Sequence, residues 1–183
     1  MRLPKIKVCA LSLLVGALFW AGSECIEIMD GSVSPLVMFL TGIAFLGLCA
    51  GVWSIHAGQA TQGDMMGLIG VASMSIASFI LMFSSFTVLS QAVSYESLAA
   101  TNWFFVFFFF WIFGTPLVGF SIIRARVFPV WTGGVLILAP LVTTVAFIGG
   151  LPPIILNVSN MAHNVCFILF AGQLLLGKTE PSA

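Results

Sequence analysis

The sequence predicts an all-α, polytopic transmembrane helical bundle, with residues 1–183 forming a single transmembrane domain. The first observation is composition: 60% of the residues are hydrophobic and only 7% are charged, with a mean hydropathy of +1.17. Soluble globular domains average about 25% charged residues. So few charges cannot cover a surface that faces water, so membrane lipid is the expected partner for most of this surface.

The second observation is six apolar runs, each close to the roughly 20 residues that a helix needs to cross the hydrocarbon core. The backbone finds no water there, so each run is expected to be helical. The predicted spans are residues 6–23, 34–55, 66–89, 99–122, 130–148 and 153–176. The connections between them are too short to hold a separate folded domain.

The first run allows two interpretations. Residues 1–7 are basic, the apolar stretch that follows is short, and residues 21–23 are small, which is a signal-peptide pattern. The alternative is a first helix that stays in the mature protein. Bulky residues at 18–20 lie just before the cleavage position, so we favour retention.

The third observation is the separation of charges. With six spans and a cytoplasmic N-terminus, every basic residue falls on the cytoplasmic side, as the positive-inside rule requires; these are Arg2, Lys5, Lys7, Arg124, Arg126 and Lys178. Glu24, Glu27, Asp30 and Glu96 then lie outside. The protein is expected in the plasma membrane, with both termini on the cytoplasmic side. Arg124 and Arg126 are the topology anchors, within reach of Asp64. Basic and acidic residues are equal in number and the sequence has no basic tail. Nucleic acid is therefore not an expected partner.

The tryptophans support these boundaries, because indole rings favour the headgroup region. Trp20 and Trp103 are predicted at outer ends, Trp53 and Trp131 at inner ends, and Trp111 at mid-depth. In the fourth span the phenylalanines surround the helix. We therefore expect them to be lipid-facing and packing bulk rather than one binding face.

The sixth span holds the strongest candidate site. Asn157, Asn160 and Asn164 fall within about 60° at 100° per residue, and His163 flanks them. Polar side chains in a span usually face other helices or a cavity. These four residues are therefore a possible polar lining for a hydrophilic path. Ordinary hydrogen bonding between helices is the alternative that we favour.

The sequence gives little support for catalysis or for a bound cofactor. The spans as bounded contain no acidic residue, and the sequence lacks the hydrolase and phosphate-loop motifs. The four cysteines do not have metal-site spacing. His163 and His56 are expected at different depths, which disfavours a shared haem. Glu24 and Glu27, three residues apart, could bind a cation weakly, but a solvated helix end is the preferred interpretation. No catalytic residue, metal or cofactor is predicted.

Small residues and prolines predict packing features. Gly47 and Gly51 form a GxxxG pair, and Gly63, Gly67 and Gly70 continue the pattern. Close packing within the chain is favoured over self-association. Pro116 and Pro140 allow kinks in the fourth and fifth spans.

The stretch from Arg124 to Gly133, Arg-x-Arg-Val-x-Pro-x-Trp-x-Gly, resembles a connection in uncharacterised bacterial six-helix integral membrane proteins of the domain-of-unknown-function type. Gln59, Gly63, Gly67 and Gly70 are similar to a cytoplasmic connection in those proteins. The likeness covers about residues 34–150. It implies a six-helix bundle in the plasma membrane and supplies no activity, substrate or catalytic residue.

Three functions follow as expectations. The leading one is a non-catalytic multi-pass membrane protein that acts as a helper or interaction subunit, with itself or another membrane subunit as partner. The second is a small transporter or channel-like protein that uses the polar lining on the sixth span. The third is a haem- or quinone-linked redox subunit.

Overall fold

The computed structural model describes residues 3–59, 65–91 and 102–177, and these residues form an all-α bundle. Six of its helical segments are long and apolar enough to cross a membrane, as predicted. The helices are α1 (Leu3–Asp30), α2 (Pro35–Gly51), α3 (Trp53–Gly58), α4 (Met65–Gln91), α6 (Asn102–Ala125), α7 (Val130–Ile148) and α8 (Pro153–Leu175). Because α3 follows α2 after the single residue Val52, the two make one span, Pro35–Gly58.

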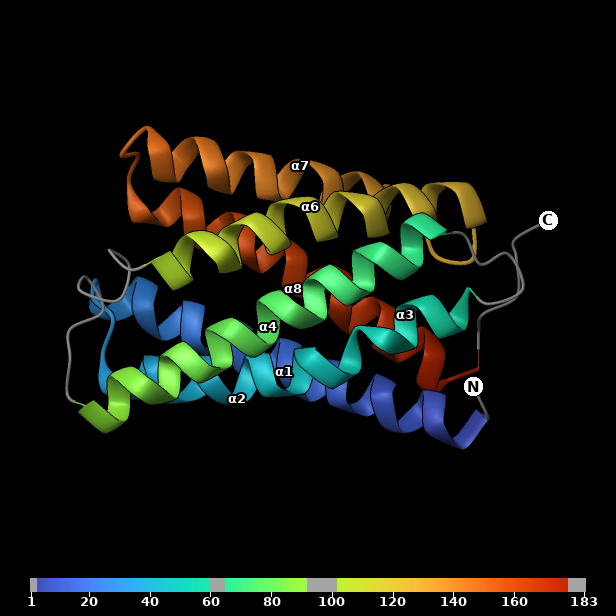
Figure 1. Cartoon of the computed structure of the whole chain (residues 1–183), viewed down its shortest axis with the longest axis horizontal. Helices are drawn as coiled ribbons and strands as arrows, with labels where there is room; N and C mark the ends of the chain where they lie inside the picture. The colour runs from blue at the N-terminus through green and yellow to red at the C-terminus, as the bar shows by residue number, and fades with distance from the viewer. Residues whose placement is uncertain (1–2, 60–64, 92–101, 178–183) are drawn as a thin grey trace.

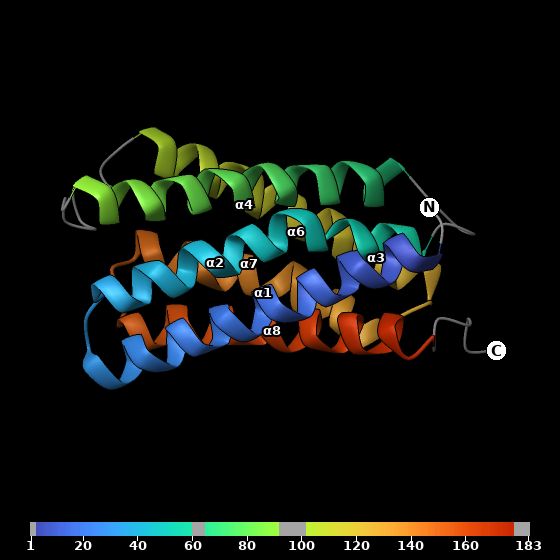
Figure 2. The same cartoon turned by 90° about the horizontal axis from the view of Figure 1, so that it is seen from below.

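The six spans form a closed ring. Each packs against the next one along the chain, and α8 returns to pack against α1. Figure 1 and Figure 2 show the helices running side by side along one long axis. We name the two ends of the bundle by residues: α1 ends and α8 begins at the Asp30 end, whereas α6 ends and α7 begins at the Arg124 end. A ring of this kind has an interior that side chains must fill or leave hollow.

The first span is longer than the sequence analysis predicted. We expected residues 24–33 to be a connection, but α1 continues to Asp30. Its 28 residues correspond to a length of about 42 Å at 1.5 Å per residue. Gly31 then ends the helix in the left-handed conformation, with φ 65° and its N–H donating to Glu27 O at 2.9 Å. Ser34 caps α2, accepting from Val37 N–H at 3.3 Å.

Glycine brings α1 and α2 into close backbone contact. A Cβ on Gly47 would lie 2.8 Å from Gly16 Cα, and one on Gly51 would lie 2.5 Å from Leu13 Cα. The predicted GxxxG pair therefore packs inside the chain. Gly70 packs in the same way against α6, where an added Cβ would lie 2.8 Å from Val118 N. Gly63 lies outside the described residues.

The interior is filled at the Arg124 end. Phe128, in the connection after α6, is 2% exposed and packs against Phe170 with ring centroids 4.7 Å apart. Gln59, expected in a polar connection, is instead 1% exposed and accepts a hydrogen bond from Ser121 Oγ at 3.2 Å. These side chains close that end because the connection folds inward over the ring.

The basic residues that the structure describes lie at one end of the bundle, as the topology prediction requires. Lys5 and Lys7 lie in the first turns of α1, and Arg124 and Arg126 lie at the end of α6, so all four are at one end. Arg124 and Arg126 are both exposed. Arg2, Asp64, Glu96 and Lys178 lie outside the described residues, and so does the suggested pairing of Asp64 with the arginines.

Candidate ligand-binding cavity

The ring encloses a cavity of about 320 Å³ at the Asp30 end. All six spans contribute to its wall. One part of the wall is aromatic: Trp20, Phe45, Phe104, Phe107, Phe108 and Trp111. The other part is polar: Glu24, Glu27, Thr41, Ser85, Thr143, Asn157 and Asn160. A mainly apolar pocket with a few converging polar groups is typical of small-molecule sites.

Glu24 is the central polar group of this cavity. Only 6% of the residue is exposed. Its Oε1 accepts two hydrogen bonds, from Trp20 Nε1 at 2.7 Å and from Asn160 Nδ2 at 2.9 Å. Its Oε2 is buried and has no hydrogen-bond partner among the residues that the structure describes. The interpretation of Glu24 as part of a solvated helix end, outside any span, is therefore wrong.

Helical spacing explains how α1 builds its part of the wall. Trp20, Glu24 and Glu27 stand at positions i, i+4 and i+7, which lie on one face of a helix. Glu27 is half-buried, nearer the end of the bundle. Asn157 shares the cavity wall with Glu27, and Asn160 hydrogen-bonds Glu24. Two acids on α1 therefore match two amides on the antiparallel α8, with the same three-residue spacing.

The aromatic part of the wall is compact. The ring centroids of Trp20 lie 4.9 Å from Phe45 and 5.4 Å from Trp111. Phe45 and Trp111 are 5.8 Å apart, and Phe107 lies 6.0 Å from Trp111. We name Trp20, Phe45, Phe107 and Trp111 the aromatic box. These rings present both faces and edges beside the Glu24 carboxylate.

Two aromatic predictions need correction. Trp20 was expected at a headgroup boundary, but it is 5% exposed, because α1 continues beyond it for ten residues. The phenylalanines of the fourth span were expected to share no binding face. Phe105 and Phe109 are indeed exposed, but Phe104, Phe107, Phe108 and Trp111 face the cavity. Trp53, Trp103 and Trp131 are exposed, and their positions at the membrane boundary stay a prediction.

The predicted polar lining of the sixth span divides into two pairs. Asn157 and Asn160 line the cavity. His163 and Asn164 do not; they are 0% and 1% exposed and lie deeper along α8. The His163 ring centroid is 5.7 Å from that of Trp111, and its Nδ1 is 3.2 Å from Ser159 O. The hydrogen-bonding alternative also holds in part, since Asn160 donates across to α1.

The remaining candidates lie elsewhere. Arg124 and Arg126 are at the opposite end of the bundle and do not contribute to the cavity. His56 lies on α3, near that same end. In the described parts of the chain, no three His, Cys, Asp or Glu side chains come together as metal ligands would. Cys9, Cys25, Cys49 and Cys166 are free.

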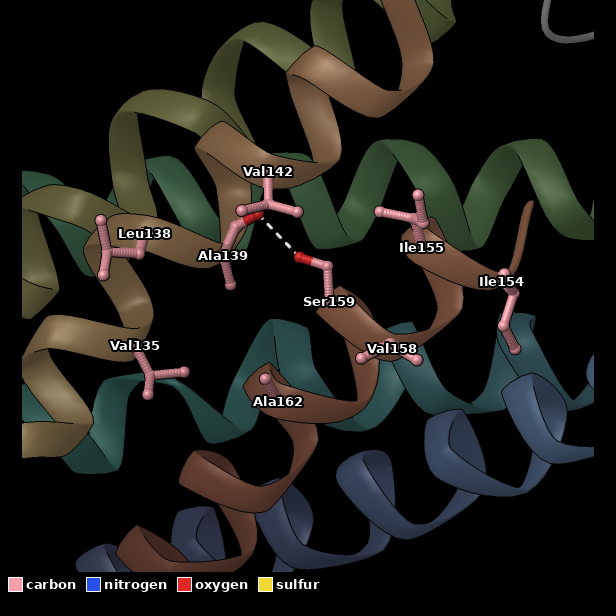
Figure 3. Close-up of a pocket in the computed structure, with 9 residues that line it drawn as sticks. All are labelled: Val135, Leu138, Ala139, Val142, Ile154, Ile155, Val158, Ser159 and Ala162. Atoms are coloured by element: carbon pink, nitrogen blue, oxygen red, sulfur yellow. Dashed lines mark hydrogen bonds between the residues drawn. The ribbon is translucent and has the colours of Figure 1, made fainter. Parts of the chain in front are cut away.

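A second hollow lies between α7 and α8 (Figure 3) and measures about 420 Å³. Its wall is almost entirely aliphatic, with Leu138 and Val158 62% and 60% exposed. Ser159 donates its hydroxyl hydrogen to Ala139 O at 2.7 Å. This groove lies on the exposed side of two apolar helices. It offers no polar group to select a ligand.

Comparison with protein-family models, with curated proteins and with solved structures finds no match to this chain.

Proposed function

We propose that this chain is a non-catalytic, multi-pass protein of the plasma membrane that binds a small ligand in the cavity and carries it across the bilayer. The observation that supports the proposal is the carboxylate of Glu24, held by two donors on one oxygen with the other oxygen buried and without a partner. A buried polar atom left without a hydrogen-bond partner is costly. Such an arrangement is expected where a ligand completes the site.

The shape of the cavity supports binding of something larger than water. Its volume of about 320 Å³ lies at the lower end of the range for small-molecule pockets. Its rim at the Asp30 end includes Glu27, Phe147 and Pro153, which are half-buried or exposed. A ligand can therefore enter from that end, which we propose faces the outside of the cell, as the positive-inside rule predicts.

Carriage across the membrane requires the ring to open at its other end. The helices α6 and α7 both line the cavity and both contain an interior proline, Pro116 and Pro140. Proline removes one backbone hydrogen bond and permits bending. Thr144 Oγ1 donates to Pro140 O at 2.6 Å, and side-chain bonds of this kind often accompany a bend in a helix. We propose that these helices bend to release the ligand past Phe128.

The proposal is tested by following ligand binding through tryptophan fluorescence, with the protein in lipid nanodiscs. Trp20 and Trp111 line the cavity, so an occupant changes their emission. A panel of small amphipathic cations, neutral molecules and anions is titrated. We expect at least one charge class to bind saturably, and Thr41→Phe, which fills the cavity, to abolish that binding.

Leu40→Phe is the matched control, because Leu40 is the neighbour of Thr41 and is not among the lining residues. It should leave binding unchanged. Flux of the bound class into proteoliposomes then tests carriage. If no charge class binds, the proposal fails. The helper or interaction-subunit role, which the sequence analysis favoured, is then the better account.

A further inference from the structure

We infer, on the basis of the proposed ligand-binding function, that the ligand is an organic monocation with an apolar body. Its charged head, an ammonium or a related group, lies against Glu24 Oε2, and its body lies against the aromatic box. Four features lead to this class: the charge of the cavity, the orientation of Glu24, the aromatic faces, and the absence of a cluster of metal ligands among the described residues.

The cavity carries acidic groups without basic ones. Glu24 and Glu27 are on its wall, and no lysine or arginine lines it in the described parts of the chain. The basic residues that can be followed are at the opposite end of the bundle, about the length of a span away. Coulomb interactions are strong where water is scarce. The site therefore favours cations and repels anions.

The hydrogen bonds to Glu24 leave one position open. Trp20 and Asn160 both donate to Oε1, which fixes the plane of the carboxylate. Oε2 is left as a buried acceptor without a donor in the structure. A charged donor there would make a charge-assisted hydrogen bond, which is about twice as strong as a neutral one. A quaternary ammonium without N–H groups would still compensate the charge.

The aromatic box is suited to a cation with an organic surface. Trp20 and Trp111 meet edge to face, with an interplanar angle of 77°, and Phe45 and Phe107 complete the wall. The faces of aromatic rings attract cations, tryptophan most strongly. The same faces are unfavourable for an anion.

A metal ion fits the cavity poorly. Hard cations such as Ca²⁺ take six to eight oxygen ligands and Mg²⁺ an octahedral set. No three His, Cys, Asp or Glu side chains come together in the described parts of the chain, and Asn160 turns its amide nitrogen toward the carboxylate. Glu27, half-buried and one turn nearer the rim, attracts the cation first, before it reaches Glu24. An organic cation needs only the two acidic side chains, Glu24 and Glu27, and the aromatic box.

The experiment compares three probes of similar size on the wild-type protein in nanodiscs: benzyltrimethylammonium, 3-phenyl-1-propanol and phenylacetate. We expect saturable tryptophan quenching by benzyltrimethylammonium, with an affinity at least about 10-fold above that of the alcohol and no binding of phenylacetate. This selectivity is measured without any substitution, so it does not depend on whether a variant folds.

Two pairs of variants then locate the cation. Glu24→Gln should weaken benzyltrimethylammonium binding by at least about 30-fold, as expected when one partner of a buried charge pair is removed. Gln can still accept from Trp20 and Asn160 through its carbonyl oxygen. Asp30→Asn, an exposed acid on the same helix, should have no effect. Phe107→Leu should cost roughly 3- to 10-fold, and exposed Phe105→Leu should cost nothing.

The outcomes distinguish a failure of the cation inference from a failure of the proposed ligand-binding function. If the alcohol or phenylacetate binds as well as the cation, and Thr41→Phe abolishes that binding, the ligand-binding function stands and the cation inference is overturned. Equal cation affinity in wild type and a folded Glu24→Gln variant also overturns the inference. If no probe of any charge class binds, both proposals fail.

Discussion

At the scale of single residues, Arg126 shows how a charge can occupy a conformation that favours glycine. The helix α6 ends at Ala125, and Arg126 follows with φ 54°. Its N–H donates to Ile122 O at 3.0 Å, which satisfies a carbonyl at the helix end. Arg126 is the only residue other than glycine with a positive φ in the described residues. The side chain there is basic, and its role as a topology anchor stays a prediction.

This conformation gives a prediction. Arg126→Gly removes the left-handed strain, whereas Arg126→Ala keeps it, and both variants remove the charge. We expect Arg126→Gly to be more stable than Arg126→Ala by about 1 kcal/mol. Thermal unfolding of the purified variants in detergent measures the difference. Equal unfolding temperatures would mean that the positive φ is not maintained in the folded protein.

Glu24 is the other informative residue. Its burial depends on Trp20, four residues earlier on the same helix, and on Asn160, which is 136 positions away. The Trp20, Glu24 and Glu27 spacing is visible in the sequence and could have indicated a polar face on an extended helix. The partner on α8 could not be identified in that way, so the acids were interpreted as facing water.

At the scale of helices, backbone contact between α1 and α2 sets the width of the ring at that point. A Cβ on Gly16 would lie 2.7 Å from Ala44 O and 2.8 Å from Leu48 N. These are backbone atoms that cannot move aside without shifting a helix. In contrast, a Cβ on Gly22, on the same helix, meets nothing within 4 Å. Alanine substitutions at Gly16 and Gly22 therefore distinguish the effect of close packing from the effect of helix propensity.

We expect Gly16→Ala to destabilise the protein by about 1–3 kcal/mol through overpacking. Gly22→Ala should be neutral, or stabilising by up to about 1 kcal/mol, because alanine is the better helix former. Thermal unfolding of both variants in the same detergent gives the comparison. A Gly16→Ala protein as stable as Gly22→Ala would show that α1 and α2 are not in backbone contact.

At the scale of the whole molecule, the ring has one hollow end and one filled end. Phe128 and Phe170 fill it at the Arg124 end, and the cavity occupies the Asp30 end. The basic residues that can be followed lie at the filled end and the cavity acids at the other. If the positive-inside rule sets the orientation, the cavity faces outward.

The orientation can be measured by cysteine labelling in intact cells. Met29, 77% exposed at the Asp30 end, and Arg126, exposed at the other, are replaced singly by cysteine in a protein carrying Cys25→Ser. We expect a membrane-impermeant maleimide to label position 29 from outside, and position 126 only after permeabilisation. The reverse pattern would place the cavity on the cytoplasmic side.

The sequence by itself determined the fold class and the number of spans. In lipid the backbone has few alternatives to a helix, so six long apolar runs sufficed to predict six spanning helices. Helical spacing also placed Asn157 and Asn160 on one face of α8, and both line the cavity; that they form a hydrophilic path stays a prediction. The sequence did not determine where the first helix ends, since acidic residues ordinarily indicate water.

Only the tertiary structure decided that Glu24 is buried, that part of the fourth span faces inward, and that His163 lies below the cavity rather than on its wall. Each of these depends on which helices are neighbours in the ring. An almost uniformly apolar helix carries little information about which face meets lipid and which meets protein, because hydrocarbon and core are nearly equivalent solvents for it. The site exists because the ring closes α8 against α1, which brings the Asn160 amide to the Glu24 carboxylate.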